Sequence, residues 1–249
     1  MLDSLEEIFR LGTMATGIEG ERVLLNSHTP MEQGLFIQKI YDTIKPERSL
    51  EIGFAMGIST MFILEKCREY KRNNKCHIVI EPYSWGPAAM FNITKEGLDK
   101  YVDLRNELSD RILPQMYLDN ERIQMAYVDT TKVFDTVLQD FYFIDKILDV
   151  GGVIIIDDAT CGGVGTVVRF INTLPHYQVM ERFQKVQLSG KVKLEQKLLE
   201  LTLKLMPFRN KFKRQFLLKS AAQLELDYRC IAFKKLKNDS RPWDWYKPF

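Results

Sequence analysis

The sequence has few of the features that mark membrane, secreted or zinc-binding proteins. No run of ~18 apolar residues occurs, so we expect no membrane span. The opening residues lack the basic region and the apolar stretch of a secretory signal. The 4 cysteines are scattered without a C-x-x-C pair, and the 3 histidines lie far apart, which leaves too few ligands at a usable spacing for a Cys/His zinc site. These absences indicate a reduced, soluble, cytoplasmic protein.

The composition is that of a globular protein, but its charge is uneven. Hydrophobic residues make up 45% and charged residues 27% of the 249 residues, which excludes a wholly disordered or collagen-like chain. The net charge is +2, yet residues 185–219 alone carry 10 basic and 2 acidic residues. A mildly acidic body therefore carries one strongly basic segment.

Short apolar runs alternate with amphipathic stretches of helical length from residue 48 onward. The runs predict strands at residues 49–53, 77–80, 102–104, 123–128 and 153–156. The stretches between and after them predict helices at residues 59–70, 111–118, 134–148 and 167–174. Such alternation is typical of an α/β, doubly wound and mainly parallel sheet with helices on both faces.

We expect a single domain over residues 1–249, built of four parts. They are an N-terminal helical cap at 1–45, a core at 46–184, a basic helical insertion at 185–222, and the last strand with an aromatic tail at 223–249. Strands are also predicted near 177–183 and 228–233, on either side of the insertion. The tail holds 2 of the 3 tryptophans, so we expect it to pack on the rest of the chain.

The residues that follow each strand are the candidate site, because ligands bind at the carboxyl edge of an open parallel sheet. Gly53 and Gly57 bracket a turn into a helix, where backbone N–H groups can face a ligand. Ala55 stands where a dinucleotide site prefers glycine, so the loop suits a nucleoside without a diphosphate. Such turns are also common without a ligand.

Acidic and hydroxyl side chains follow the next two strands. Glu81 is placed to accept both hydroxyls of a ribose, and the alternative is a solvated acid at a strand end. Ser109 and Asp110 open a helix, where they would either cap it or contact an adenine.

Three carboxylates leave two strands that we expect to be neighbours, namely Asp129, Asp157 and Asp158. Like charges crowded together need a cation, and oxygen ligands without histidine suit Mg²⁺. The alternative is that Asp158 caps the next helix and Asp157 is exposed.

Together these motifs resemble the class I S-adenosylmethionine-dependent methyltransferases. The nearest resemblance is to the metal-dependent O-methyltransferases of the catechol and caffeoyl-CoA type and of the macrolide-sugar type. The matching stretches are residues 29–34 (TPMEQG), 50–59 (LEIGFAMGIS), 80–81 (IE), 109–114 (SDRILP), 128–132 (VDTTK) and 151–158 (GGVIIIDD). The resemblance implies a seven-stranded, Rossmann-like methyltransferase fold whose N-terminal helices and 28–30 turn close over the cofactor.

The resemblance also implies which residues hold S-adenosylmethionine. The loop after the first strand would do so through Glu51, Gly53, Gly57 and Ser59, with Gly53 and Ser59 against the methionine part. Glu81 would hold the ribose, Ser109 and Asp110 the adenine edge, and Asp129 would lie near the amino group.

The implied chemistry is metal-assisted methyl transfer to a hydroxyl. Asp129, Asp157 and Asp158 would bind Mg²⁺, and Lys132 falls where the catechol-type enzymes carry a general base, provided its pKa is lowered. The sugar-type relatives have histidine there, whereas the catechol type has Asp-Asn in place of Asp157-Asp158. The acceptor is therefore open between a sugar-like metabolite and a catechol, and His28 is an alternative base.

Two other functions are alternatives to methyl transfer. The first is a catalytically silent methyltransferase-like domain that binds partners through its basic insertion. The second is an NAD-dependent oxidoreductase, which Ala55 disfavours. The insertion itself would pack on the domain or on a second copy in a homodimer, cover an acidic substrate, or contact a membrane surface or nucleic acid. We do not expect nucleic acid, because aromatic residues do not interleave with the lysines in its first half.

Overall fold

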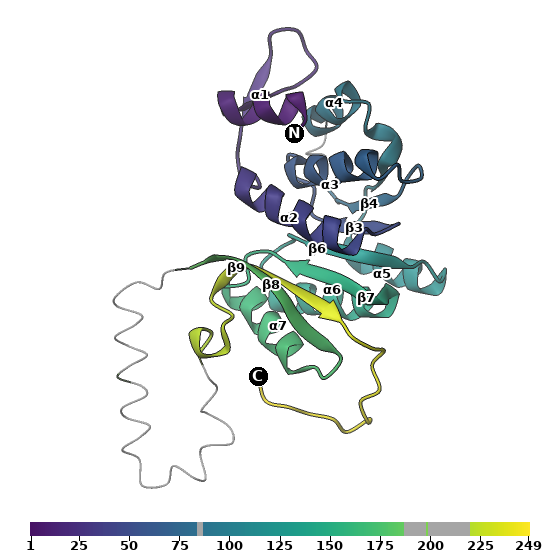
Figure 1. The fold of residues 1–249 in the computed structure, drawn as a ribbon, viewed down its shortest axis with the longest axis vertical. Coiled ribbons are helices and arrows are strands. Elements are labelled where there is room, and N and C mark those ends of the chain that lie inside the picture. Colours follow the sequence, from purple (N-terminus) through teal and green to yellow (C-terminus); the bar gives the residue numbers. More distant parts are fainter. Residues whose placement is uncertain (84–86, 187–197, 199–219) are drawn as a thin grey trace.

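The computed structural model describes residues 1–83, 87–186, 198 and 220–249, and within them the centre is a seven-stranded sheet (Figure 1). The strand order is β5-β4-β3-β6-β7-β9-β8. The strands are β3 (Ser49–Ile52), β4 (His77–Ile80), β5 (Val102–Arg105), β6 (Ile123–Val128), β7 (Leu148–Ile156), β8 (Tyr177–Lys185) and β9 (Tyr228–Lys235). Strands β3 to β7 pair in parallel, whereas β9 is antiparallel to both β7 and β8. The prediction of a doubly wound, mainly parallel seven-stranded sheet is confirmed.

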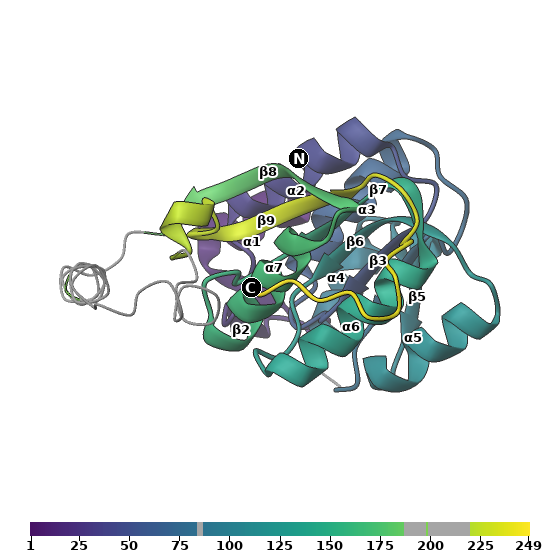
Figure 2. The same ribbon diagram turned by 90° about the horizontal axis from the view of Figure 1, so that it is seen from below.

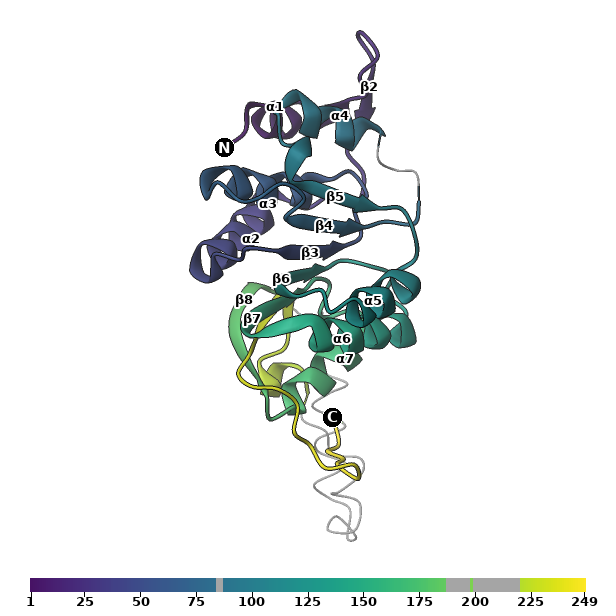
Figure 3. The same cartoon turned by 90° about the vertical axis from the view of Figure 1, so that its right-hand side faces the viewer.

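Helices cover both faces of this sheet, with α2 and α3 on one side and α5, α6 and α7 on the other (Figure 3). The helices are α1 (Asp3–Leu11), α2 (Met31–Ile44), α3 (Ile58–Glu69), α4 (Pro87–Lys95), α5 (Ser109–Leu118), α6 (Phe134–Ile147) and α7 (Gly162–Thr173), with short 3₁₀ turns at Asp99–Tyr101 and Ala222–Leu224. In the part of the chain that the structure describes, no helix is both long and apolar enough to cross a membrane.

The central strands are apolar at successive positions because both of their faces are buried. Met125 and Tyr127 of β6 join the apolar layer under α2 and α3, whereas Ala126 and Val128 join the layer under α5 to α7. This is the pattern expected of a parallel sheet that is covered on both sides.

The N-terminal region differs from the expected run of helices. Between α1 and α2 lies a separate two-stranded sheet of β1 (Thr13–Ala15) and β2 (Arg22–Leu24). Strands of 3 residues are too short to show a two-residue alternation, so the sequence pattern missed them. Helix α4 was also missed, although its first residue is Pro87, a usual helix start.

Two boundaries were wrong and one region falls outside the structure. Helix α7 begins at Gly162, 5 residues before the predicted start at 167. Strand β7 begins at Leu148, 5 residues before the predicted start at 153, and runs through Gly151 and Gly152. The basic insertion predicted at 185–222 lies largely outside the described residues.

The aromatic tail packs in part, as expected. It ends beside α7 (Figure 2), where the rings of Phe249 and Phe170 stand edge to face at 5.4 Å. The Arg241 guanidinium lies 4.7 Å from the Trp245 ring, and Trp245 packs against the core. Trp243, in contrast, is 98% exposed.

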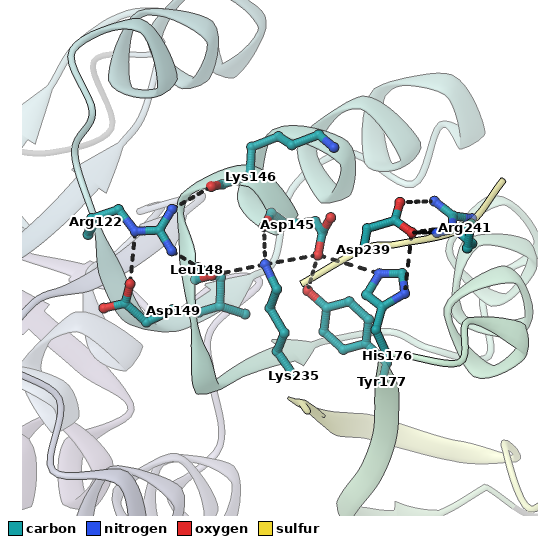
Figure 4. A network of polar contacts seen from close by, with 10 residues as sticks. All are labelled: Arg122, Asp145, Lys146, Leu148, Asp149, His176, Tyr177, Lys235, Asp239 and Arg241. Atoms are coloured by element: carbon teal, nitrogen blue, oxygen red, sulfur yellow. Dashed lines mark hydrogen bonds and ion pairs between the residues drawn. The ribbon is translucent and has the colours of Figure 1, made fainter. Parts of the chain in front are cut away.

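A polar cluster at the amino-terminal edge of the sheet lies beside the start of this tail (Figure 4). Asp145 accepts a hydrogen bond of 2.9 Å from the Tyr177 hydroxyl and lies 3.3 Å from the Lys235 ammonium. Asp239 accepts two hydrogen bonds from the guanidinium of Arg241 in the tail and one from its backbone N–H.

His176 lies between these two carboxylates without a hydrogen bond. Its ring nitrogens are 3.7 Å from Asp145 and 3.8 Å from Asp239, too far for one, and its side chain is buried. Burial lowers the pKa of His176, although the two carboxylates oppose this. The folded state therefore favours the neutral imidazole.

The first prediction concerns this histidine. Because the unfolded chain binds a proton at His176 more readily than the folded one, the group lowers the free energy of unfolding as the pH falls through about 6.5. We subtract the free energy of unfolding of His176→Phe from that of the unmodified chain, both measured by urea unfolding. We expect this difference to decrease from pH 8 to pH 5. His28→Phe is the control. A difference that grows on acidification would mean that Asp145 and Asp239 hold a protonated imidazole.

Candidate active site

The glycine loop after β3 is pressed against the end of β6. Gly53 has φ +95°, and a Cβ added to it would lie 2.1 Å from the backbone oxygen of Asp129. Gly57, with φ +67°, precedes the first turn of α3. Ala55 also adopts a positive φ, 41°, which is strained for any residue but glycine. The loop thus needs glycine at Gly53 both for its φ and for space.

A cavity of about 380 Å³ opens beside this loop at the carboxyl edge of the sheet. Its wall combines the ends of β3, β4 and β6 with the start of α5, and it includes four of the predicted cofactor residues, Gly53, Glu81, Ser109 and Asp129. The volume is in the range of small-molecule and cofactor sites.

Glu81 holds the loop from inside this cavity. Its carboxylate accepts hydrogen bonds from the backbone N–H groups of Phe54 at 2.9 Å, Ala55 at 3.2 Å and Tyr83 at 2.9 Å. A carboxylate has about four acceptor positions, so three backbone donors leave room for a ligand hydroxyl.

Glu51 does not line the cavity, which corrects its expected contact with the cofactor. The side chain is completely buried behind the loop and accepts hydrogen bonds from Ser59 and from Thr60 at 2.7 Å, with the His77 ring nitrogen 3.0 Å away. Glu51 therefore ties β3 to β4 and to the first turn of α3. A buried carboxylate without these partners would be strongly destabilising.

Gly57 and Ser59 line a second, small cavity instead. Its wall also contains His28, Thr29 and Asp129. The turn before α2 thus lies over the glycine loop, in the place that the resemblance implies.

At the start of α5, Ser109 lines the cavity of about 380 Å³, whereas Asp110 is exposed and does not line it. The residue before the helix is Leu108, and no side chain caps it. The alternative that Ser109 or Asp110 is a capping residue is therefore wrong.

Asp157 is buried, contrary to the alternative that it is exposed. One oxygen accepts from the Gln33 amide at 2.7 Å and the Tyr127 hydroxyl at 3.0 Å. The other accepts from the Cys230 thiol at 2.9 Å and the Asp158 N–H at 2.7 Å. Both oxygens are thus fully used.

Asp129 and Asp158 share one cation, the Lys132 ammonium. It lies 2.7 Å from Asp129 Oδ1 and 2.9 Å from Asp158 Oδ2. Partial desolvation opposes it, but the two carboxylates raise the pKa of Lys132, so the side chain is protonated at neutral pH. Burial and the charge of Asp157 raise the pKa of Asp129 to about 6, although Lys132 opposes this. Asp158 does not cap α7, whose preceding residue is Cys161.

This arrangement does not fit a metal site made of three carboxylates. The Lys132 ammonium already lies between Asp129 and Asp158, and Asp157 has no oxygen left for an ion. Among the described ranges, three ligand-type atoms within 4.8 Å of one another occur at Asp145, His176 and Asp239, at the other edge of the sheet.

The sequence did not predict the three side chains that donate hydrogen bonds to Asp157. Gln33 stood inside the matching stretch at 29–34, which was the one signal that could have identified it. Tyr127 and Cys230 are a single hydroxyl and a single thiol in apolar strands, and such residues are usually part of a core.

The geometry of the loop gives a second prediction. Gly53→Ala should unfold at a lower temperature and lose affinity for S-adenosylhomocysteine, because its Cβ would meet the Asp129 carbonyl at 2.1 Å. Gly97→Ala is the matched control: its φ is +66°, but nothing lies within 4 Å of the added Cβ. Equal losses in both variants, measured by thermal unfolding and calorimetry, would show that positive φ alone is responsible.

Known proteins share this sequence pattern and this fold. Residues 50–159 match a family model described as a methyltransferase domain. The comparison with curated proteins finds no match. The matched segment contains the glycine loop, Glu81, Asp129 and Lys132.

Several solved structures superpose on most of the chain. The cofactor-bound protein Rv0187 from MTB has a TM-score of 0.59 and 14% identity, over 86% of this chain and 84% of its own. An O-methyltransferase from Bacillus cereus in complex with SAH has a TM-score of 0.58 and 19% identity, over 73% and 84%. The O-methyltransferase TomG from Streptomyces achromogenes, involved in tomaymycin synthesis and in complex with SAM, has a TM-score of 0.57 and 16% identity, over 85% and 82%. The chain therefore has the fold of these structures, and residues 50–159 match the model of a methyltransferase domain, in agreement with the resemblance of its sequence to the class I S-adenosylmethionine-dependent methyltransferases.

Proposed function

We propose that this protein transfers a methyl group from S-adenosylmethionine to a hydroxyl of a small molecule. The observation that supports this best is the cavity of about 380 Å³ at the carboxyl edge of the sheet. It brings the glycine loop, Glu81, Ser109 and Asp129 together within the segment that matches the methyltransferase model.

The residues of this cavity fit the cofactor. Gly53, which has no side chain, lets the loop lie against the Asp129 backbone. Glu81 keeps an acceptor position for a ribose hydroxyl, and Ser109 lies on the wall where the adenine edge is expected. When bound, S-adenosylmethionine supplies an electrophilic methyl carbon. The task of the protein is then to orient the acceptor oxygen and remove its proton.

Lys132 is suited to hold the acceptor oxygen rather than to act as the general base. A protonated ammonium donates hydrogen bonds and stabilises negative charge that develops on the oxygen. Asp129 is the better base, because its pKa of about 6 is close to neutral pH. The base role that the resemblance implied for Lys132 would require both carboxylates to be drawn away from its ammonium.

Mg²⁺ remains a prediction from the resemblance, and we derive no step through it. Asp157 is fully hydrogen-bonded, and the Lys132 ammonium lies between the other two carboxylates, where the implied ion would bind.

The cofactor site is tested by binding. Glu81→Gln should weaken binding of S-adenosylhomocysteine about tenfold or more, since a charged acceptor of several hydrogen bonds is lost. Glu69→Gln, an exposed change on α3, should leave it unchanged. Absence of S-adenosylhomocysteine binding to the unmodified chain would overturn the proposed function. Binding without transfer to any hydroxylated acceptor is what the silent binding domain predicts.

The catalytic centre is tested by turnover and its pH dependence. Lys132→Met should lower kcat about 10²-fold, and Lys132→Arg should restore part of it, because the positive charge returns. In the unmodified chain kcat/KM should fall as the pH drops through about 6, since Asp129 then takes up a proton. A rise in kcat/KM only well above neutral pH would instead favour Lys132 as the base.

The metal is tested separately. We expect full activity in excess chelator, because Lys132 supplies the cation between Asp129 and Asp158. Loss of activity that added Mg²⁺ restores would contradict this and support the metal site of three carboxylates.

A further inference from the structure

A larger cavity, of about 640 Å³, lies between the β1–β2 hairpin and α4. Figure 3 shows these elements side by side at one end of the molecule. None of the described residues that line it is charged, and most are apolar, including Met14, Val23, Leu24, Pro87 and Ala89. The volume suits a small organic molecule.

The walls of this cavity are held by polar contacts outside it. The Asn92 amide donates to the backbone oxygen of Ala15 in the hairpin at 2.8 Å, and so fixes the hairpin to α4. Arg22 pairs with Glu7 of α1 at 2.7 Å and donates to Thr13 across the hairpin at 2.7 Å. The cavity is therefore preformed.

The cavity adjoins the candidate active site. Ser27, Ala55 and Met56 line both this cavity and the small one that contains Asp129. Ala55 also lines the cofactor cavity. A molecule in the cavity of about 640 Å³ can therefore extend along the glycine loop toward Asp129.

We infer that this cavity binds the body of the methyl acceptor, and that the acceptor is a hydroxylated molecule with an uncharged, apolar body. This inference rests on the proposed function and narrows its substrate class. A phosphate or carboxylate in the cavity would lose its hydration without gaining a charged partner, which is strongly unfavourable. An alkyl or aromatic group gains from burial there.

The rim of the cavity supports the same class of ligand. Leu24 is 78% exposed and Ile18 is 68% exposed, although both line the cavity. These two side chains expose apolar surface to water at the rim. An apolar acceptor would cover that surface on binding.

The test uses catechol and its 4-methyl, 4-propyl and 4-hexyl derivatives, titrated calorimetrically into the protein saturated with S-adenosylhomocysteine. We expect affinity to rise about threefold for each added methylene group. Leu24→Glu should weaken 4-hexylcatechol binding about tenfold and leave catechol binding unchanged, because it places a charge beside the alkyl chain. Leu118→Glu is the control, since Leu118 is exposed at the end of α5 and does not line the cavity.

Binding and methyl transfer are measured on the same compounds, so the inference and the proposed function can fail separately. Equal affinity across the series, or equal effects of Leu24→Glu and Leu118→Glu, would overturn the inference even if catechol is methylated. Affinity that rises with chain length and is sensitive to Leu24→Glu supports the inference. If no member of the series were then methylated, the inference would stand and methyl transfer to catechols would be contradicted.

Discussion

The buried carboxylate of Asp157 is the constraint on which the candidate site depends. An ionised group in the interior is stable only when its hydrogen bonds are satisfied, and here the donors come from α2, β6 and β9. Burial and the charge of Asp157 raise the pKa values of Tyr127 and Cys230, so both keep the protons that they donate. This one charge therefore holds α2 over the carboxyl edge of the sheet and leaves Asp129 and Asp158 to pair with Lys132.

Other carboxylates act in the same way around the cofactor cavity. Glu51 joins two strands and a helix from behind the glycine loop, and Glu81 holds the loop by its backbone N–H groups. These acids brace the walls of the site. Chemistry on an acceptor falls to the partly exposed group of Asp129, Lys132 and Asp158, which has a net charge of −1 when all three are ionised.

Much of the fold could be predicted because apolar residues repeat with different periods in strands and in helices. The strands at 77–80 and 123–128 matched to the residue, and the glycine turn placed the cofactor cavity correctly. The directions of side chains could not be predicted, because β3 is buried on both faces and nothing in its pattern says that Glu51 points away from the loop. The protonation of Lys132 depends on two carboxylates that approach it only in the folded chain.

The position of β9 has a consequence for how the chain is made. β9 is synthesised last of all the strands in the sheet but lies between β7 and β8, which have no direct pairing with each other. Until residues 228–235 have left the ribosome, β7 has an open edge and β8 has no partner at all. Any nascent or truncated chain that stops before Tyr228 therefore exposes apolar strand edges of the kind that recruit chaperones or aggregate.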